Sequence, residues 1–171
     1  LANGDRNAAF CLTEPDHGSD AANLQTRATR DGDDYILNGN KVYISGGTVA
    51  DQLTVFARTG GPGAKGISAF VVDAHAAGVA IDRTDDKMGV RSVPTAHFSF
   101  QDVRVPAENL LGGDEGAGFN HAMLTLNSMR PTVGARGVGL AEGAAGYAME
   151  WARERKAFGN PVIDFEAIQF M

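Results

Sequence analysis

Cysteine is almost absent from this 171-residue sequence, because Cys11 is its only example. A single thiol excludes an intrachain disulfide. The four histidines are scattered, at His17, His75, His97 and His121, and no cysteines or histidines have the short spacing of a zinc site. We therefore expect neither a disulfide-stabilised domain nor a metal centre.

Long apolar runs and an excess of basic residues are also missing. No segment reaches the length of about 20 apolar residues that crosses a bilayer, and the start lacks a signal-peptide pattern. Lys and Arg number 15 against 21 Asp and Glu, a net charge of −6. An acidic chain without a basic run is a poor candidate for binding nucleic acid or an anionic membrane. Hydrophobic residues make up 43% of the chain, which is enough for a packed core.

The two ends indicate a piece of a longer protein. The chain begins at Leu1, and its last residues stop inside an apolar helical pattern with no C-cap signal. Missing segments could contain a transit peptide, so the compartment, bacterial cytoplasm or mitochondrial matrix, stays undetermined at this point.

Short β-forming segments dominate the first two thirds of the sequence. We expect strands at Tyr35–Leu37, Lys41–Ser45, Gln52–Arg58, Ile67–Val72, Ala96–Phe100 and Val103–Val105. Asn38-Gly39 predicts a tight hairpin between the first two, because a primed turn needs positive φ. No helix-length periodic segment interrupts these strands. The spacing predicts an antiparallel barrel or sandwich over residues 1–113.

The pattern becomes helical from Gly116 onward. Apolar or small residues recur at helical spacing at Phe119, Met123, Leu126, Val133, Gly137, Ala141, Ala145 and Ala148. Pro131 should kink or break this helix, Gly159 and Pro161 should end it, and a new helix should begin near Asp164. We predict an α+β chain, with residues 114–171 forming the truncated start of a helical-bundle domain.

A glycine-rich loop at Gly61–Gly66 matches the GxGxxG pattern of dinucleotide-binding proteins. That pattern requires a following helix whose N-terminus faces a pyrophosphate. Here a β-forming run follows at once, and Pro62 stiffens the loop. We interpret the segment as an ordinary loop between two strands.

The segment Cys11–Asp20 combines hydroxyls, acids, a proline and a glycine within ten residues. Gly18 allows a ligand to approach the backbone. Backbone N–H groups with the hydroxyls of Thr13 and Ser19 could bind a polar ring or phosphate oxygens. From these residues alone, an ordinary capped turn is slightly favoured over a ligand-binding loop, because Thr and Ser side chains also form hydrogen bonds with the local backbone.

This segment closely resembles the T-E-P-x-x-G-S-D signature of the acyl-CoA dehydrogenase family. Further matches follow in the family's order: Asn38-Gly39, Lys41 and Tyr43–Ser45; Lys87–Arg91 with Thr95; Phe100–Pro106; Gly116–Phe119; Arg130-Pro131; and Arg153–Gly159. So many matches in order are highly specific. The chain is therefore similar to the middle β-domain and the first part of the C-terminal helical domain of these FAD enzymes.

The resemblance implies a set of FAD contacts. The expected cofactor-binding residues are Phe10, Leu12, Thr13, Gly18, Ser19, Tyr43, Ile44, Ser45, Arg155 and Phe158. Tyr43 stands where the family usually has Trp, and Ser45 where it usually has Thr. These changes keep an aromatic face and a hydroxyl. Arg155 would reach the FAD pyrophosphate of a neighbouring subunit, although a solvated helix end is the alternative.

The substrate would be an acyl-CoA thioester, with Ser19, Asn127 and Arg130 as expected contacts. Three positions depart from the family pattern, at His17, Asn23 and Glu166, and the carboxylate of Glu166 makes an FAD contact there doubtful. Loop similarity to isobutyryl-CoA dehydrogenase favours a short or branched acyl chain.

The family reaction is α,β-dehydrogenation, in which a glutamate removes the α-proton and the flavin takes the β-hydrogen as hydride. In a minority of members this base immediately precedes the arginine of the substrate helix, where this chain has Met129. We expect no catalytic residue in this chain, a base C-terminal of Met171, and no activity from the 171 residues alone.

The resemblance also implies partners, namely an electron-transferring flavoprotein and further copies in a homotetramer. Two alternatives stay open. One is an acyl-CoA oxidase on the same scaffold, which oxygen would reoxidise rapidly. The other is a non-catalytic β-barrel interaction module, which would not take up FAD.

Overall fold

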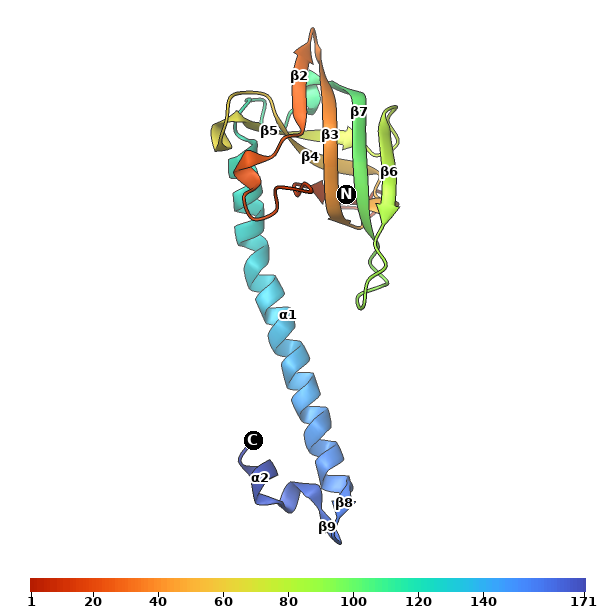
Figure 1. Ribbon diagram of the computed structural model, residues 1–171, viewed down its shortest axis with the longest axis vertical. Coiled ribbons are helices and arrows are strands. Elements are labelled where there is room, and N and C mark those ends of the chain that lie inside the picture. Colours follow the sequence, from red (N-terminus) through yellow and green to blue (C-terminus); the bar gives the residue numbers. More distant parts are fainter. The chain divides into compact units, whose positions relative to one another are not determined.

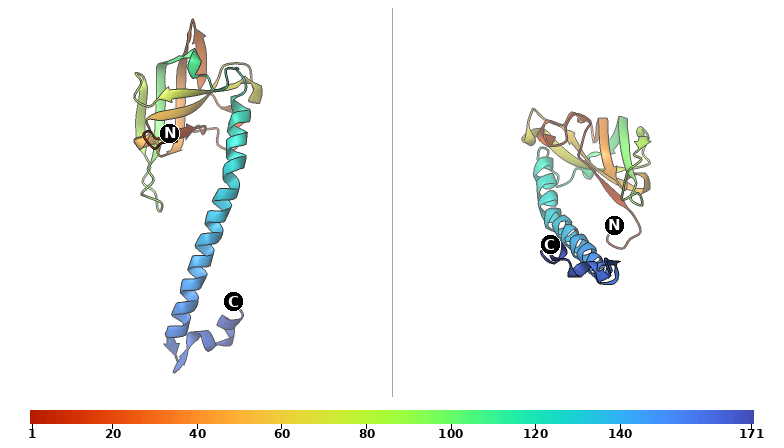
Figure 2. Two further views of the ribbon diagram at one scale, coloured as in Figure 1. Left: turned by 180° about the vertical axis from the view of Figure 1, so that it is seen from behind. Right: turned by 60° about the horizontal axis from the view of Figure 1, so that its bottom comes forward.

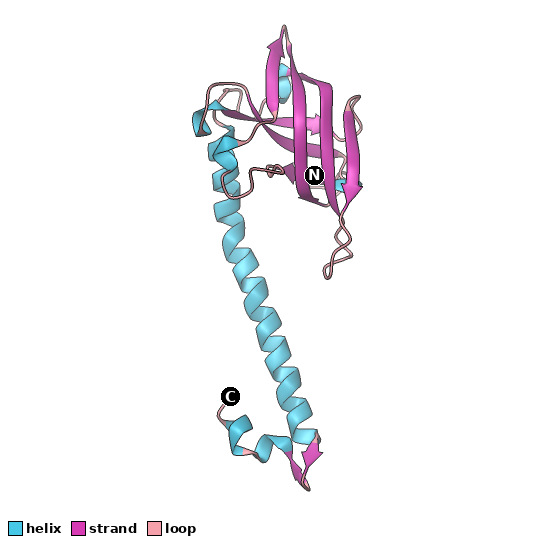
Figure 3. Ribbon diagram, viewed as in Figure 1, coloured by secondary structure: helices cyan, strands magenta, loops and turns pink.

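The computed structural model describes all residues from Leu1 to Met171. It divides into two compact units, Leu1–Leu124 and Thr125–Met171. The strands gather in the first unit, and the second is mainly helical (Figures 1 and 3). The α+β class predicted from the sequence is confirmed.

A curled sheet of seven strands forms the first unit. The strands are β1 (Ala8–Cys11), β2 (Arg27–Asp31), β3 (Asp34–Ser45), β4 (Gln52–Arg58), β5 (Ile67–Asp73), β6 (Val79–Thr84) and β7 (Thr95–Pro106). Their order is β1-β4-β2-β3-β7-β6, with β5 paired to β4. In Figure 1, β4 and β5 cross behind β3 and β7, and the left view of Figure 2 brings them to the front. The sheet therefore closes as a half-barrel around an interior core.

The sheet is mixed, which corrects the expectation of a purely antiparallel domain. Four strand pairs are antiparallel, namely β2–β3, β3–β7, β4–β5 and β6–β7. However, β4 pairs in parallel with both β1 and β2. Parallel neighbours need a long connection, and the irregular segment after β1, together with the β2–β3 hairpin, supplies it. This segment contains the signature loop.

The hairpin predicted at Asn38-Gly39 was wrong. β3 runs through both residues, and its pairing with β7 shifts register between Leu37 and Gly39, which marks a bulge. The tight turn lies earlier, where Gly32, at φ 64°, follows Asp31 and joins β2 to β3. Because β3 is uninterrupted, it forms backbone hydrogen bonds along most of β7. A turn at Asn38 would lose these hydrogen bonds.

The core lies inside the curled sheet. Its largest side chains, Tyr35, Phe70, Phe98 and Phe100, are 2% exposed or less. The rings of Tyr35 and Phe70 lie 4.9 Å apart in a tilted pair. Burying each such side chain stabilises the fold by about 1.5–3 kcal/mol. This core fixes the inward face of β3 and leaves its other face for a site.

Short 3₁₀ turns connect the strands: η1 (Ala21–Asn23), η2 (Gly47–Val49), η3 (Ala64–Gly66) and η4 (Ala107–Asn109). The glycine-rich loop at Gly61–Gly66 joins antiparallel β4 and β5, and no helix follows it. The rejection of a dinucleotide fingerprint is therefore confirmed.

The long helix α1 (Gly118–Glu154) starts in the first unit. Gly118 lies against β5, because a Cβ there would stand 2.4 Å from the carbonyl carbon of Ser68. Pro131 lies inside this continuous helix, so the predicted break was wrong. Proline removes only the hydrogen bond to the carbonyl of Asn127. Residues around Pro131 are exposed, so water can solvate that carbonyl.

The second unit contains most of α1 and a short C-terminal segment. After α1 come β8 (Lys156–Ala157), β9 (Asn160–Pro161), η5 (Val162–Asp164) and α2 (Glu166–Gln169). The predicted helix end before Gly159 and the new helix near Asp164 are confirmed. None of the helices combines the length and the hydropathy that a membrane span requires.

Candidate functional site

The signature loop leaves β1 and folds back on itself. Glu14 and His17 exchange backbone hydrogen bonds of 3.3 and 3.2 Å across Pro15 and Asp16. Gly18 is exposed, its φ is not positive, and a Cβ there would meet nothing within 4 Å. No packing inside the chain therefore requires glycine at position 18.

The loop lies directly against β3. The Val42 N–H donates to the Thr13 carbonyl at 2.9 Å. One residue away, the Lys41 ammonium donates to the Leu12 carbonyl at 3.0 Å and to Glu14 Oε1 at 2.9 Å. Two segments almost thirty residues apart thus share one set of hydrogen bonds.

The Glu14–Lys41 pair is buried, with the side chains 5% and 0% exposed. The Glu14 carboxylate also accepts the backbone N–H groups of Gln25 at 2.5 Å and Thr26 at 2.9 Å. Burial acts to raise the pKa of Glu14, but the Lys41 charge and these hydrogen bonds outweigh it and hold the pKa below its ordinary value. Burial lowers the pKa of Lys41, and Glu14 opposes this shift. The geometry is that of an ionised pair.

The strand side of the site presents an aromatic ring. Tyr43 has φ 60° and its side chain is 63% exposed. It lies at a second register shift of β3, between Lys41 and Ile44. A positive φ costs a non-glycine residue about 1–3 kcal/mol, and such strain clusters at functional sites. The bulge turns Tyr43 outward and returns Ile44 to the core, where it is 2% exposed.

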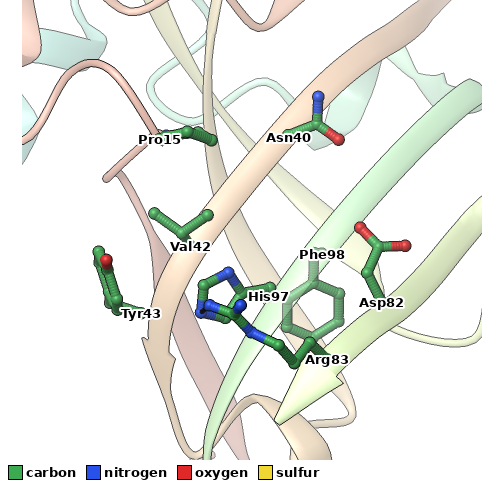
Figure 4. Close-up of a pocket in the computed structure, with 8 residues that line it drawn as sticks. All are labelled: Pro15, Asn40, Val42, Tyr43, Asp82, Arg83, His97 and Phe98. Carbon is green, nitrogen blue, oxygen red and sulfur yellow. Dashed lines mark hydrogen bonds between the residues drawn. The ribbon is translucent and has the colours of Figure 1, made fainter. Parts of the chain in front are cut away.

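The loop and the strand line one cavity of about 390 Å³. Its walls are Pro15, Asn40, Val42, Tyr43, Asp82, Arg83, His97 and Phe98. Figure 4 shows these residues, with Pro15 at the loop and the others on β3, β6 and β7. Small-molecule sites span about 300–1,000 Å³, so this cavity can accept part of a ligand.

A polar cluster borders the cavity beside Tyr43. His97 Nε2 lies 3.0 and 3.1 Å from the two oxygens of Asp85. The Arg83 Nη2 lies 3.2 Å from the same nitrogen and 3.4 Å from Asp85. The ring of His97 contacts Tyr43 edge-on at 5.2 Å between centroids. This cluster fixes His97 and thereby supports the Tyr43 ring.

The predicted cofactor residues of the first unit lie along the two segments. Phe10 packs its ring on Phe56 at 4.8 Å, and Leu12 is buried. Ser19 and Ser45 are exposed. The structure thus brings Thr13 and the strand at Tyr43 together, with Gly18 and Ser19 open to solvent at the loop end.

The remaining predicted residues belong to the second unit. Arg155 is exposed, with its guanidinium 6.0 Å from the centroid of Trp151. Phe158 is 95% exposed at φ 52°. Asn127 Oδ1 accepts a 2.7 Å hydrogen bond from Arg130. These side chains are available to a ligand or to another chain.

Sequence reasoning missed several residues of the site. Asn40, Arg83 and His97 line the cavity, and Lys41 organises the loop. Lys41 is buried in β3 together with Leu37, but the turn predicted at Asn38-Gly39 placed the two residues on different strands, so strand parity did not reveal it. The cavity residues of β6 had no such signal, since β6 was not predicted as a strand.

Comparison with known proteins gives the family. Residues 9–103 match the family model "Acyl-CoA dehydrogenase, middle domain", and residues 116–171 match "Acyl-CoA dehydrogenase, C-terminal domain". The first match alone covers more than half of the chain. The protein belongs to the acyl-CoA dehydrogenase family.

Individual relatives agree with this assignment. The mitochondrial isobutyryl-CoA dehydrogenase of Bos taurus is 45% identical over 95% of this chain and 39% of its own length. The caffeyl-CoA reductase-Etf complex subunit CarC of Acetobacterium woodii is 41% identical over 100% of this chain and 45% of its own. The butyryl-CoA dehydrogenase structure from Megasphaera elsdenii superimposes with a TM-score of 0.93 and 44% identity, over 98% of this chain and 44% of that one. The chain therefore spans less than half the length of these relatives.

Proposed function

We propose that this chain is the flavin-binding part of an FAD-dependent acyl-CoA dehydrogenase, with the isoalloxazine held between the signature loop and β3. One observation supports this most directly. The Thr13–Val42 hydrogen bond joins the two segments, and Pro15 and Tyr43 line the same cavity. Membership of the acyl-CoA dehydrogenase family supports FAD as the cofactor.

The residues present fit a flavin. An exposed aromatic ring at Tyr43 offers a flat apolar face. The Ser45 hydroxyl is exposed two residues later and offers a hydrogen-bonding group. At the loop end, the open space above Gly18 allows phosphate oxygens to approach the backbone. The polar and apolar surfaces that FAD needs therefore occur in one region.

The role of the chain's own residues is to bind and orient the cofactor and the substrate. Bound flavin supplies the two-electron acceptor that takes the substrate's β-hydrogen. Phe10, Leu12 and Thr13 would contact the flavin from β1 and the signature loop, and Tyr43, Ile44 and Ser45 would contact it from β3. Gly18 and Ser19 contact the pyrophosphate, and Ser19 also lies near the CoA moiety. Such positioning supplies much of the rate enhancement of an enzyme whose cofactor does the redox chemistry.

Residues of the second unit are also proposed to bind the cofactor and the substrate. Arg155 and Phe158 bind the FAD of a neighbouring subunit, and Asn127 with Arg130 contacts the acyl-CoA. Arg155 suits the pyrophosphate because a guanidinium donates two parallel hydrogen bonds. The exposure of Arg155 and Phe158 supports a role toward another chain.

The general base lies outside this chain. Glu14 is excluded because its carboxylate is buried and already occupied by Lys41 and two backbone N–H groups. Met129, at the position that some family members use, cannot accept a proton. As the resemblance to most family members implies, a glutamate C-terminal of Met171 removes the α-proton, and the 171 residues alone catalyse no turnover.

We propose a short or branched acyl-CoA as substrate, an electron-transferring flavoprotein as electron acceptor, and a homotetramer as the assembly. The names of the isobutyryl-CoA and butyryl-CoA relatives support the acyl group. The Etf-complex name of the Acetobacterium relative supports the acceptor. The compartment would be the bacterial cytoplasm or the mitochondrial matrix.

The test uses the full-length protein purified without added flavin. We expect a yellow protein that releases FAD on denaturation and oxidises butyryl-CoA or isobutyryl-CoA with an artificial electron acceptor. Because one relative is named a reductase, the reverse reduction of the enoyl-CoA is measured beside it. Rapid reoxidation of the reduced protein by oxygen would indicate an oxidase instead. A colourless protein that takes up no FAD would contradict the proposal.

A further inference from the structure

A buried cation and a buried anion join the two halves of the proposed flavin site. Lys41 has no exposed side-chain surface, and Glu14 is 5% exposed. The ammonium and carboxylate lie 2.9 Å apart, and the carboxylate also accepts hydrogen bonds from the backbone N–H groups of Gln25 and Thr26. Neither charge is exposed at the surface of the first unit.

Hydrogen bonds connect this ion pair to both ends of the signature loop. Lys41 bonds the Leu12 carbonyl, which directly precedes Thr13. Glu14 bonds the N–H groups of Gln25 and Thr26, where the chain returns after the loop. The pair therefore ties the beginning and the end of the loop to β3, and Tyr43 lies two residues from Lys41.

A buried ion pair is a poor source of stability, because desolvating two charges offsets most of their attraction. Its better supported use is to specify one arrangement of the chain. Here the arrangement is an irregular loop, and its exposed end at Gly18 and Ser19 has few contacts of its own. Hydrogen bonds to an ionised group are both strong and directional.

We propose that Glu14 and Lys41 are positioning residues, which hold the signature loop at the distance and orientation from Tyr43–Ser45 that the flavin requires. The proposal rests on the proposed function and adds to it two residues that touch neither flavin nor substrate. Its consequence is that the pair determines flavin affinity and flavin environment, beyond its effect on folding.

The test compares three variants of the full-length protein with the wild type. Glu14→Gln and Lys41→Met each leave one buried charge unpaired. The double variant Glu14→Gln/Lys41→Met removes both charges at nearly constant volume, so it is expected to fold. Arg104→Met is the matched control, because it removes ion pairs with Asp31 and Asp34 at an exposed position of β7.

Three quantities are measured for each protein: the thermal midpoint without flavin, the dissociation constant for FAD, and the visible circular dichroism of the bound flavin. We expect the double variant to bind FAD at least about tenfold more weakly, which corresponds to about 1.4 kcal/mol. Its flavin circular dichroism should change, while Arg104→Met leaves both unchanged. A double variant that folds and binds FAD with wild-type affinity and spectrum would overturn the proposal.

A second measurement needs no variant. Because coupling is reciprocal, FAD binding should slow hydrogen exchange at the amides of Gln25, Thr26 and Val42 in the wild-type protein. Unchanged exchange at these amides, in a protein that binds FAD, would also overturn the positioning role. A wild-type protein that binds no FAD would instead refute the proposed function, so the two failures are distinguishable.

Discussion

Three glycines of the first unit differ in their backbone φ and in the space that a Cβ would have. Gly39 lies in β3 at φ 150°, next to the register shift with β7, and a Cβ there would stand 2.5 Å from Thr26 Oγ1 and 2.7 Å from Thr26 Cα. Gly32 lies in the β2–β3 turn at φ 64°, with nothing within 4 Å. Gly18 has neither a positive φ nor a crowded environment. Alanine at each position therefore tests a different physical effect.

The expected magnitudes follow from these environments. Gly39→Ala combines backbone strain of about 1–3 kcal/mol with overpacking of about 1–3 kcal/mol, and should lower the free energy of unfolding by about 2–6 kcal/mol. Gly32→Ala has the strain alone and should cost about 1–2 kcal/mol. Gly18→Ala should change the stability of the flavin-free protein by no more than about 0.5 kcal/mol. It should nevertheless weaken FAD binding, because its methyl group fills the open space at the loop.

The assay is guanidinium unfolding of the flavin-free full-length protein, followed by titration of each folded variant with FAD. Gly32→Ala is the matched control for Gly39→Ala, since both introduce a Cβ at positive φ and only one meets a neighbour. Equal losses for the two variants would refute the close packing of Gly39 on Thr26. A Gly18→Ala variant with wild-type FAD affinity would refute the role assigned to that glycine.

Three further predictions concern buried polar groups. Burial raises the pKa of the Cys11 thiol to about 12, so the folded protein should react with a maleimide or disulfide reagent only as fast as it unfolds; rapid labelling under native conditions would contradict this. The pKa of Glu14 is lowered in the folded protein, so the ionised carboxylate stabilises the fold at neutral pH. This stabilisation is lost as the pH falls through the pKa of the folded state. The difference in free energy of unfolding between wild type and Glu14→Gln, measured by denaturant unfolding, should therefore shrink below about pH 4. Arg58 donates five hydrogen bonds to backbone carbonyls and is 8% exposed. Arg58→Ala should therefore lower the free energy of unfolding by about 2–4 kcal/mol and speed proteolysis within Gly60–Gly66. Unchanged cleavage would show that these hydrogen bonds do not order the loop.

Strands with strong local signals were predictable from the sequence. β4 was predicted with both ends as observed, because Gln52–Arg58 is a β-forming run bounded by turn residues. The short strands β1 and β2 were not predicted, because their place in the sheet depends on pairing with β4 from far along the chain. Local periodicity contains no information about such partners.

Asn38-Gly39 and Pro131 show where local rules are overridden. Asn-Gly favours a turn, but β3 pairs with β7 on both sides of it, so the strand continues through Asn38-Gly39. Pro131 is a helix breaker, yet α1 loses only one hydrogen bond there and continues.

Motif matching found the loop and the strand of the candidate site. It did not find the partner of Glu14, because a lysine in a strand is ordinarily expected to face solvent. Only the structure places Lys41 at the Glu14 carboxylate.

An experimental structure of the full-length protein with FAD tests the central claim most directly. We expect the isoalloxazine to lie between the Thr13–Ser19 loop and the Tyr43–Ser45 segment of β3, in contact with both. A flavin bound elsewhere, with no contact to either segment, would contradict it.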